Sequence, residues 1–198
     1  MDPTRCMVDN IDDPQKILCY RIIPSRYGTI GIVYVKKKND VQVMRIVLPQ
    51  QRIPMRERIA VMFPRARSDS SRIIDDICKK ITTFLKGRPV TFTLDRIDVS
   101  RFYNFQKRVL LLERKIPRSW VSTYGRLSQK LGVPGASRAV GQALARNPFP
   151  IIIPCHRTIK SDGSLGGYSG GIKLKRQLLE LEGVKFDRRG RVIMENVW

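Results

Sequence analysis

Apolar and polar positions in the first half of the chain follow a pattern that predicts a small sheet with one helix. Runs rich in β-branched residues predict strands at residues 17–23, 29–35 and 41–48. The charged segment 36–40 between the last two runs predicts a hairpin turn. Residues 49–69 contain three prolines and little periodicity, which predicts a loop, and residues 90–94 predict a further strand.

A helical repeat occupies residues 71–86. Ser70 or Ser71 can cap the start of this helix, and Gly87 can end it. Its apolar side chains fall on one stripe, which consists of Ile73, Ile74, Ile77, Ile81, Phe84 and Leu85.

The second half is predicted to be mainly helical. Pro117 stops a first helix, and Thr123 can cap a second that runs through Leu131. A last helix runs from about Ile172 to Glu182 and ends at Gly183. The stripe of the first helix is Phe102, Phe105, Val109, Leu112 and Ile116. A third helix lies between the second helix and the last one and runs from Ala136 to about Ala145. One of its faces holds Ala136, Ala139, Val140, Ala143 and Leu144.

These elements predict an α+β fold in two domains. We expect an N-terminal α+β domain at residues 1–97, a mainly helical domain at 98–185 and a tail at 186–198, and 198 residues are enough for two small domains. No apolar stretch reaches the length of a membrane span, and the N-terminus lacks the apolar core of a signal peptide. We therefore expect a soluble intracellular protein that does not associate with membranes.

The charge of the chain predicts a polyanionic partner. The net charge is +21, from 38 basic and 17 acidic residues. Residues 1–99 hold 19 basic and 11 acidic residues, whereas residues 100–198 hold 19 and 6. The more one-sided second half favours nucleic-acid binding there. The alternative is a basic surface that only resists aggregation.

Two short helices around the turn 132–135 are typical of a helix-turn-helix. The second helix is built mostly from small residues, with Arg138 near its start. Small side chains let a helix backbone approach a DNA groove closely, but they are poorly suited to reading base edges. The alternative is a tightly packed core helix with a solvated Arg138.

The four cysteines, at positions 6, 19, 78 and 155, include no Cys-x-x-Cys pair. This spacing is not that of a secreted disulfide framework. A zinc site made from Cys6, Cys19 and Cys78 would lack a fourth ligand. We interpret these three as buried thiols, and one disulfide among them stays open.

Candidate chemistry concentrates in Pro154-Cys155-His156-Arg157, which contains the one histidine of the chain. A cysteine beside a histidine indicates an activated nucleophile, because the thiolate is the reactive form. Neighbouring side chains in an extended segment point to opposite faces, so the pair needs a sharp turn or a bridging water. A carboxylate must orient the imidazole, and the residues alone leave Glu180 and Glu182 as candidates.

The second half closely resembles the O6-alkylguanine-DNA alkyltransferase family. The motifs that carry the resemblance are Arg138-Ala-Val-Gly-Gln-Ala-Leu-Ala-Arg-Asn-Pro-Phe-Pro-Ile-Ile-Ile-Pro-Cys-His-Arg157, the glycine-rich residues 166–171, and Leu-Glu182-Gly. Residues 117–125 also match, and the resemblance covers about residues 100–185. The resemblance implies an RNase H-like N-terminal domain that stabilises the protein. It also implies a DNA-repair methyltransferase that acts as a monomer and is associated with the nucleoid, or lies in the nucleus of a eukaryote.

The resemblance also implies roles for individual residues. Cys155 would accept the alkyl group, His156 would act as a base through a water, and Glu182 would orient the histidine. Asn147 would organise the turn, and Tyr124 would donate a proton toward the departing guanine. Arg138 would fill the space of a flipped nucleotide. The base would be held by Tyr168, Ser169, Thr158 and Lys175, and further DNA contacts would come from Thr123, Ala136, Ser137 and Ala139.

The implied reaction removes the alkyl group from O6-alkylguanine, or from O4-alkylthymine, in duplex DNA. The product is a stable thioether, so each molecule would act once, without a metal or organic cofactor. Two rival hypotheses remain. One is a Cys-His-Glu hydrolase with no role on nucleic acid, and the other is a non-catalytic DNA-binding module that recognises or regulates at alkylated lesions.

Overall fold

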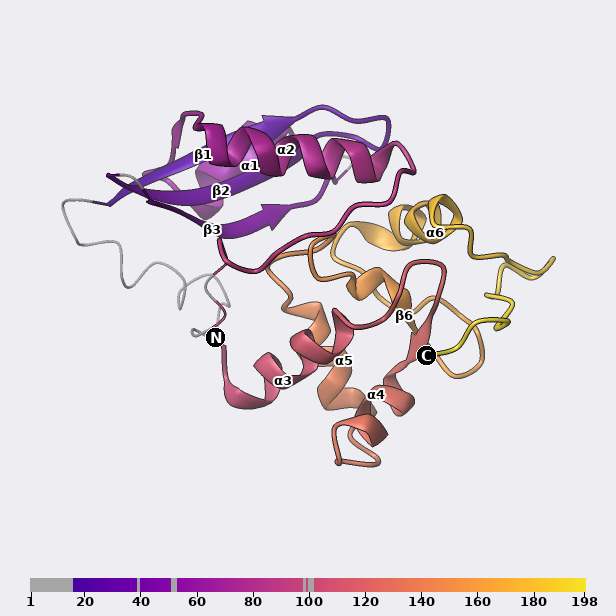
Figure 1. Cartoon of the computed structure of the whole chain (residues 1–198). Coiled ribbons are helices and arrows are strands. Elements are labelled where there is room, and N and C mark those ends of the chain that lie inside the picture. Colours follow the sequence, from indigo (N-terminus) through magenta and orange to yellow (C-terminus); the bar gives the residue numbers. More distant parts are fainter. Residues whose placement is uncertain (1–15, 39, 51–52, 98, 100–101) are drawn as a thin grey trace. The chain divides into compact units, whose positions relative to one another are not determined.

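The computed structural model describes residues 16–38, 40–50, 53–97, 99 and 102–198, and these fall into two compact units (Figure 1). One unit is formed by Met1–Phe84 with Val90–Asp98, and the other by Leu85–Pro89 with Val99–Trp198. No helix among the described residues is both long and apolar enough to cross a membrane.

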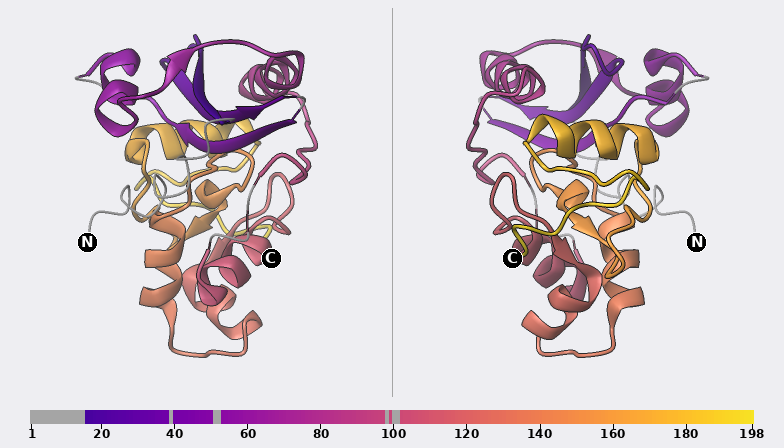
Figure 2. Two further views of the ribbon diagram at one scale, coloured as in Figure 1. Left: turned by 90° about the vertical axis from the view of Figure 1, so that its left-hand side faces the viewer. Right: turned by 90° about the vertical axis from the view of Figure 1, so that its right-hand side faces the viewer.

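The first unit is a four-stranded sheet flanked by two helices. The strands β1 (Ile17–Ile23), β2 (Ile30–Lys37) and β3 (Asp40–Val47) pair antiparallel, and β4 (Arg67–Ser68) pairs parallel to β1, in the order β3-β2-β1-β4. Figure 2 shows the strands as one curved layer with α1 (Met55–Met62) and α2 (Arg72–Leu85) beside it. The three predicted strands and the predicted helix are therefore confirmed, with ends that differ by at most two residues.

One face of this sheet packs against α1, and the contact is close. Gly31 allows it, because a Cβ at this position would lie 2.8 Å from Ile59 and 3.0 Å from the Met55 sulfur. Buried apolar residues of both elements form one cluster, which consists of Leu18, Val33, Val35, Met44, Val47, Met55, Ile59 and Phe63. This cluster is the main apolar core on that side of the unit.

Two predictions for the first unit are wrong. The predicted loop 49–69 contains α1 and β4. Helix α1 has about two turns between its caps Pro54 and Phe63, and only Met55 and Ile59 of its residues are buried. So short a helix leaves almost no periodic signal. Residues 90–94 form no strand; Phe92 packs edge-on against Phe84, and only Ile97 makes an isolated bridge to β3.

The described thiols of this unit are Cys19, which is buried, and Cys78, which is half-buried. Cys19 and Cys78 are free, and Cys6 lies outside the described residues. Burial raises the pKa of both described thiols to about 11, with Asp69 beside Cys19 and Asp75 beside Cys78 acting in the same direction. No group of three or more candidate metal ligands occurs in the described part of the chain.

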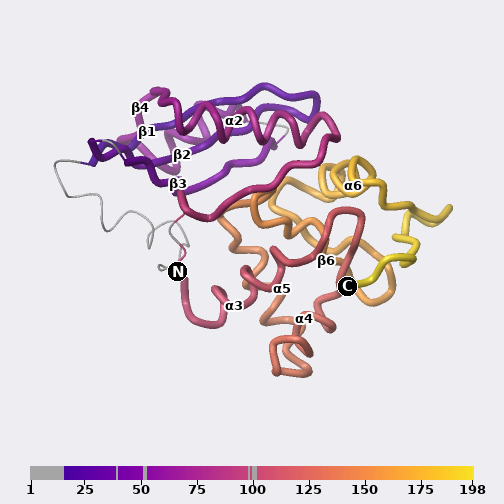
Figure 3. The backbone as a smooth tube through the Cα atoms, viewed as in Figure 1, coloured from indigo at the N-terminus to yellow at the C-terminus, as the bar shows by residue number. Residues whose placement is uncertain are grey.

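The second unit is mainly helical, as the sequence predicts. It contains α3 (Asn104–Glu113), α4 (Tyr124–Lys130), α5 (Ser137–Ala145) and α6 (Gly171–Leu181). A two-stranded parallel ladder joins β5 (Ser122–Thr123) to β6 (Thr158–Ile159). The 3-10 helix η2 (Cys155–Arg157) comes directly before β6. The chain path of this unit can be followed in Figure 3.

Helices α4 and α5 pack on each other across a tight turn. The Thr123 hydroxyl accepts a hydrogen bond from the Arg126 amide at 3.2 Å and so caps α4, as predicted. The turn needs Gly132 and Gly135, whose φ values are 74° and 84°. The buried face of α5 is narrower than predicted, because it centres on Val140, Ala143 and Leu144. Ala139 lies at its outer edge and is exposed, and Ala136 is half-buried.

The segment after α6 packs onto this unit. Val192 is buried in an apolar cluster with Leu179 and Val184, and Val197 forms a bridge beside Val121. The Trp198 carbonyl accepts hydrogen bonds from Ser122 Oγ at 3.0 Å and Arg126 Nε at 3.1 Å. The Trp198 ring lies 4.2 Å from Lys130 Nζ. Residues 196–198 therefore hold the start of α4.

Deletion of residues 196–198 is expected to destabilise the second unit by about 2 kcal/mol or more, because several hydrogen bonds to Val121, Ser122 and Arg126 are lost together. Urea unfolding followed by circular dichroism measures the change. Met194→Ala is the control, because Met194 is exposed and belongs to the same segment. An unfolding midpoint equal to that of the intact chain would contradict the role given to residues 196–198.

Candidate active site

Cys155 lies at the end of a tight turn that Asn147 braces. The Asn147 side chain is buried and accepts a hydrogen bond from the Phe149 amide at 3.0 Å. Its Nδ2 donates to the Ile153 carbonyl at 2.9 Å and to Cys155 Sγ at 3.1 Å. Ile151 has a φ of 76°, a left-handed conformation that a β-branched residue rarely adopts. One amide side chain thus fixes both a strained turn and the thiol.

The 3-10 turn of η2 separates the two neighbouring side chains of the motif. Cys155 faces a cavity, whereas His156 is fully buried and its Nε2 lies 3.2 Å from Glu182 Oε1. The turn therefore directs Cys155 to the cavity and His156 to Glu182.

Glu182 is held by three hydrogen bonds. Besides the bond to His156, Arg157 donates through Nε to Oε2 at 2.9 Å and through Nη2 to Oε1 at 2.7 Å. Arg157 also donates to the Ile116 carbonyl. The alternative carboxylate, Glu180, is exposed and pairs with Arg176. Two residues apart on one helix, the two glutamates face different surroundings, and only Glu182 reaches the histidine.

The charge states of His156 and Glu182 follow from burial together with their charged partners. Burial alone would raise the pKa of Glu182, but the charge and hydrogen bonds of His156 and Arg157 outweigh it and lower that pKa to about 2. Burial lowers the pKa of His156, and the Glu182 carboxylate opposes that shift only in part. At neutral pH we therefore expect an ionised Glu182, balanced by Arg157, beside a neutral histidine that can accept a proton.

The resting thiol is protonated. Burial raises the pKa of Cys155 to about 12, and the negative charge of Glu113 adds to this, while the Asn147 hydrogen bond and Lys175 oppose it. A thiol with this pKa is a weak nucleophile until a base removes its proton. Any reaction of Cys155 as a nucleophile would therefore need a base.

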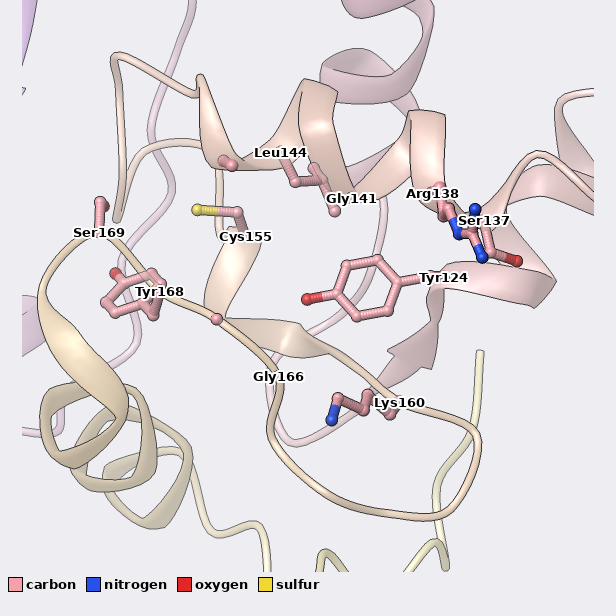
Figure 4. A pocket seen from close by; sticks show the side chains of 12 residues that line it. Tyr124, Ser137, Arg138, Gly141, Leu144, Cys155, Lys160, Gly166, Tyr168 and Ser169 are labelled. Carbon is pink, nitrogen blue, oxygen red and sulfur yellow. The ribbon is translucent and has the colours of Figure 1, made fainter.

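A cavity of about 590 Å³ opens in front of Cys155. Figure 4 shows the Tyr124 hydroxyl pointing into this cavity, between Cys155 and Gly166. A Cβ on Gly166 would lie 2.8 Å from that hydroxyl, so glycine is required for the tyrosine to take this position. The remaining lining residues are Ser137, Arg138, Gly141, Leu144, Ala145, Lys160, Gly167, Tyr168 and Ser169.

The structure places the predicted base-binding residues in two groups. Tyr168 and Ser169 line the cavity, and the Tyr168 ring packs edge-on against His156 with centroids 6.4 Å apart. Thr158 and Lys175 do not line it and are fully buried. Lys175 Nζ donates to the Thr158 carbonyl at 2.6 Å and to the Gly167 carbonyl at 3.4 Å, so it joins the cavity loop to β6.

The predicted DNA contacts are also divided. Ser137 and Arg138 line the cavity, and Arg138 and Ala139 are exposed on α5. Thr123, in contrast, is buried, and its hydroxyl is occupied as the cap of α4.

Sequence reasoning missed Glu113. This residue ends α3, is fully buried, and accepts a hydrogen bond from the Thr158 hydroxyl. The available signal was its position: Glu113 follows the buried Val109 by four residues, so a helix puts both on the same apolar face. A carboxylate on such a face is rarely placed there without a partner.

A buried cysteine faces a cavity, with a His–Glu pair behind it and the exposed Arg138 of α5 at the cavity wall, and this arrangement defines the class of proteins whose chemistry depends on a thiol. A model of the 6-O-methylguanine DNA methyltransferase DNA-binding domain matches residues 104–184. The methylated-DNA–protein-cysteine methyltransferase of Methanothermobacter thermautotrophicus is 45% identical over 114 residues, which are 58% of this chain and 64% of the relative. That of Saccharolobus islandicus is 43% identical over 61% of this chain and 75% of the relative.

Among solved structures, the Mycobacterium tuberculosis protein OGT in complex with DNA is similar over 83% of this chain and 92% of its own, at 31% identity and a TM-score of 0.66. The chain therefore belongs to the methylated-DNA–protein-cysteine methyltransferase family. The family resemblance inferred from the sequence is confirmed, and so is the mixed α+β fold.

Proposed function

We propose that this protein repairs DNA by transferring the alkyl group of O6-alkylguanine in a duplex irreversibly to its own Cys155. The observation that carries the proposal is the position of the Cys155 thiol at the cavity, hydrogen-bonded to Asn147, with the buried His156–Glu182 pair adjacent in the fold. O4-alkylthymine is a second substrate of the same chemistry, because its alkyl group is also bonded to an exocyclic oxygen.

The proposed reaction is a displacement at the alkyl carbon. His156 takes the thiol proton through one water, and Glu182 stabilises the charged imidazole. The Sγ electron pair then forms the S–C bond as the C–O6 bond breaks. Tyr124 donates a proton toward the departing guanine, because an anionic base leaves poorly. The thioether product has no bond that water readily cleaves, so the protein acts once.

The modified base must leave the stack to reach this cavity. Extruding a nucleotide costs a few kcal/mol. We propose that α4 and α5 form a helix-turn-helix whose second helix lies in a groove of the DNA. Arg138, exposed at the start of α5 and lining the cavity, would fill the space of the extruded nucleotide.

We also propose a role for the first unit, and an oligomeric state and a location for the protein. The sheet of the first unit, β3-β2-β1-β4 with α1 and α2, would be an RNase H-like domain with a stabilising role. The protein would act as a monomer on DNA in the cytoplasm and nucleoid, or in the nucleus of a eukaryote. Binding would weaken steeply with salt, because a net charge of +21 releases counterions from DNA.

Intact mass spectrometry tests the proposed function. The protein is incubated with an excess of duplex DNA that contains one O6-methylguanine. We expect a mass gain of one methyl group for one hydrogen, located on Cys155 and never more than one per molecule. Binding without a mass gain would indicate the lesion-binding module instead. Repeated turnover would exclude single use and favour a hydrolytic enzyme.

Arg138→Ala is expected to slow methyl transfer from duplex DNA about 10- to 100-fold, because the extruded state loses the side chain that replaces the base. The measurement is the single-turnover rate of methylation. The control substrate is a single-stranded oligonucleotide with the same lesion, where no stacked partner must be replaced and the rate is expected to change little. A full rate on the duplex would refute the role of Arg138 in base extrusion.

A further inference from the structure

Glu113 is a buried carboxylate that the proposed reaction does not use. It is fully buried at the end of α3, and its Oε2 accepts the Thr158 hydroxyl. Its other oxygen, Oε1, has no hydrogen-bond partner among the described residues. Burial of a carboxylate with one hydrogen bond is costly, and an apolar residue would stabilise this position better. Stability therefore does not explain why a glutamate occupies it.

A chain of hydrogen bonds connects Glu113 to the cavity. Thr158 follows the Cys155–Arg157 turn directly, and its carbonyl accepts Lys175 Nζ at 2.6 Å. The same ammonium group donates to the Gly167 carbonyl at 3.4 Å, in the loop that also carries Gly166 and Tyr168. Two residues, Thr158 and Lys175, thus connect Glu113 to the wall of the cavity.

We propose that Glu113 is a positioning residue that, through Thr158 and Lys175, sets how the transfer reaction depends on pH. This inference rests on the proposed function, because it concerns the rate at which Cys155 accepts the alkyl group. Glu113 does not line the cavity. It affects the charge of Lys175 near the thiol, and through Thr158 and Lys175 it affects the position of the loop that lines the cavity.

The charged and titratable groups around Glu113 come from three elements. They are Cys155 and Arg157 of η2, Tyr124 of α4 and Lys175 of α6. Burial raises the pKa of Glu113 to about 7, although Thr158, Lys175 and Arg157 oppose the shift. Both protonation states of Glu113 are therefore populated near neutral pH.

The two states act differently on the reacting groups. An ionised Glu113 adds to the pKa of Cys155 and of Tyr124, which makes the thiol harder to deprotonate and the tyrosine a weaker acid. A protonated Glu113 leaves the positive charge of Lys175 uncompensated, and that charge favours the thiolate as long as Lys175, whose pKa burial lowers to about 8, keeps its proton. As the pH rises through about 7, ionisation of Glu113 offsets part of the rate gain that higher pH gives a thiol reaction.

Glu113→Gln isolates this effect. The glutamine Oε1 can still accept the Thr158 hydroxyl, so the link to Lys175 persists while the negative charge is absent. The experiment compares the single-turnover rate of methylation of Cys155 by duplex O6-methylguanine for variant and parent between about pH 5.5 and about pH 7.5, a range that includes the titration of Glu113 and lies below the pKa of about 8 of Lys175. We expect the ratio of variant rate to parent rate to increase about threefold or more across this range.

Two further variants keep the test decisive. Glu113→Leu combined with Thr158→Val replaces both polar groups with apolar ones, so it is expected to fold at least as stably as the parent and to show the same rise in rate ratio. Glu180→Gln, an exposed carboxylate of the same unit, is expected to leave the profile unchanged.

A rate ratio that is constant with pH in both Glu113 variants would overturn the inference, and Glu113 would then have only a packing role. A parent protein that never gains a methyl group would instead overturn the proposed function, and the two failures are thus distinguished by the parent alone.

Discussion

Cys155→Ser is expected to abolish alkyl transfer, with a fall in rate of about 10⁴-fold or more. The substitution keeps the size of the side chain and a partner for the Asn147 amide, which donates to Cys155 Sγ at 3.1 Å. A serine hydroxyl, however, is a far weaker acid and a poorer nucleophile toward an alkyl carbon than a thiol. The thioether that would store the alkyl group cannot form.

The measurement is the transfer of radiolabelled methyl from duplex DNA to protein, with DNA binding followed separately. Binding is expected to persist, because the exposed Arg138 of α5 is untouched. Cys78→Ser is the matched control, since Cys78 is a free, half-buried thiol far from the motif in sequence. Label recovered on the Cys155→Ser protein at the parent rate would show that another residue is the acceptor.

Glu182→Gln is expected to give the second-largest effect, on stability and on rate together. Glu182 is buried, and the substitution leaves the Arg157 guanidinium without its counter-charge and turns an amide donor toward it. Loss of one partner of a buried ion pair costs about 3–5 kcal/mol of unfolding free energy. The rate of transfer is expected to fall about 10²- to 10⁴-fold, because His156 loses the group that stabilises its charged form.

The stability effect has a defined dependence on pH. The pKa of Glu182 is lowered from its ordinary 4.5 to about 2, so its contribution to stability is complete above pH 4.5. That contribution disappears as the pH falls from 4.5 through about 2. Urea unfolding of parent and Glu182→Gln should therefore differ most at neutral pH and converge in acid.

Glu180→Gln provides the comparison for this prediction. Glu180 lies on the same helix but is exposed, and its pair with Arg176 is a surface ion pair of little energetic value. Its substitution is expected to leave both the unfolding midpoint and the transfer rate nearly unchanged. Equal effects of the two substitutions would contradict the assignment of Glu182 as the carboxylate behind His156.

Local pattern was sufficient for most elements of the fold. The strands β1, β2 and β3 and the helix α2 each combine a long apolar repeat with clear ends, and their positions follow from the sequence. Helix α1 was missed because only Met55 and Ile59 of its eight residues are buried. Two buried positions do not distinguish a helix from a loop.

The candidate site was predictable to different depths. Cys155 and His156 stand out because a thiol beside the only histidine is rare in any chain. Asn147 and Tyr124 were named through the family motif, since nothing in their own spacing reveals a hydrogen bond to Sγ or a hydroxyl in a cavity. Glu113 was missed because a charged residue at the end of a helix is usually exposed to solvent, whereas Glu113 at the end of α3 is buried.

By itself, the sequence determined the candidate nucleophile, the basic character of the second half, the mixed α+β class and the family. Each of these depends on residue identity and short-range spacing, which are written directly in the chain. The tertiary structure supplied the contact between Glu182 and His156, which the residues without the family resemblance left open between Glu180 and Glu182. It alone decided that Glu113, Thr158 and Lys175 meet behind the cavity. Periodicity reports which face of an element is buried, but the partner of that face depends on how distant segments pack.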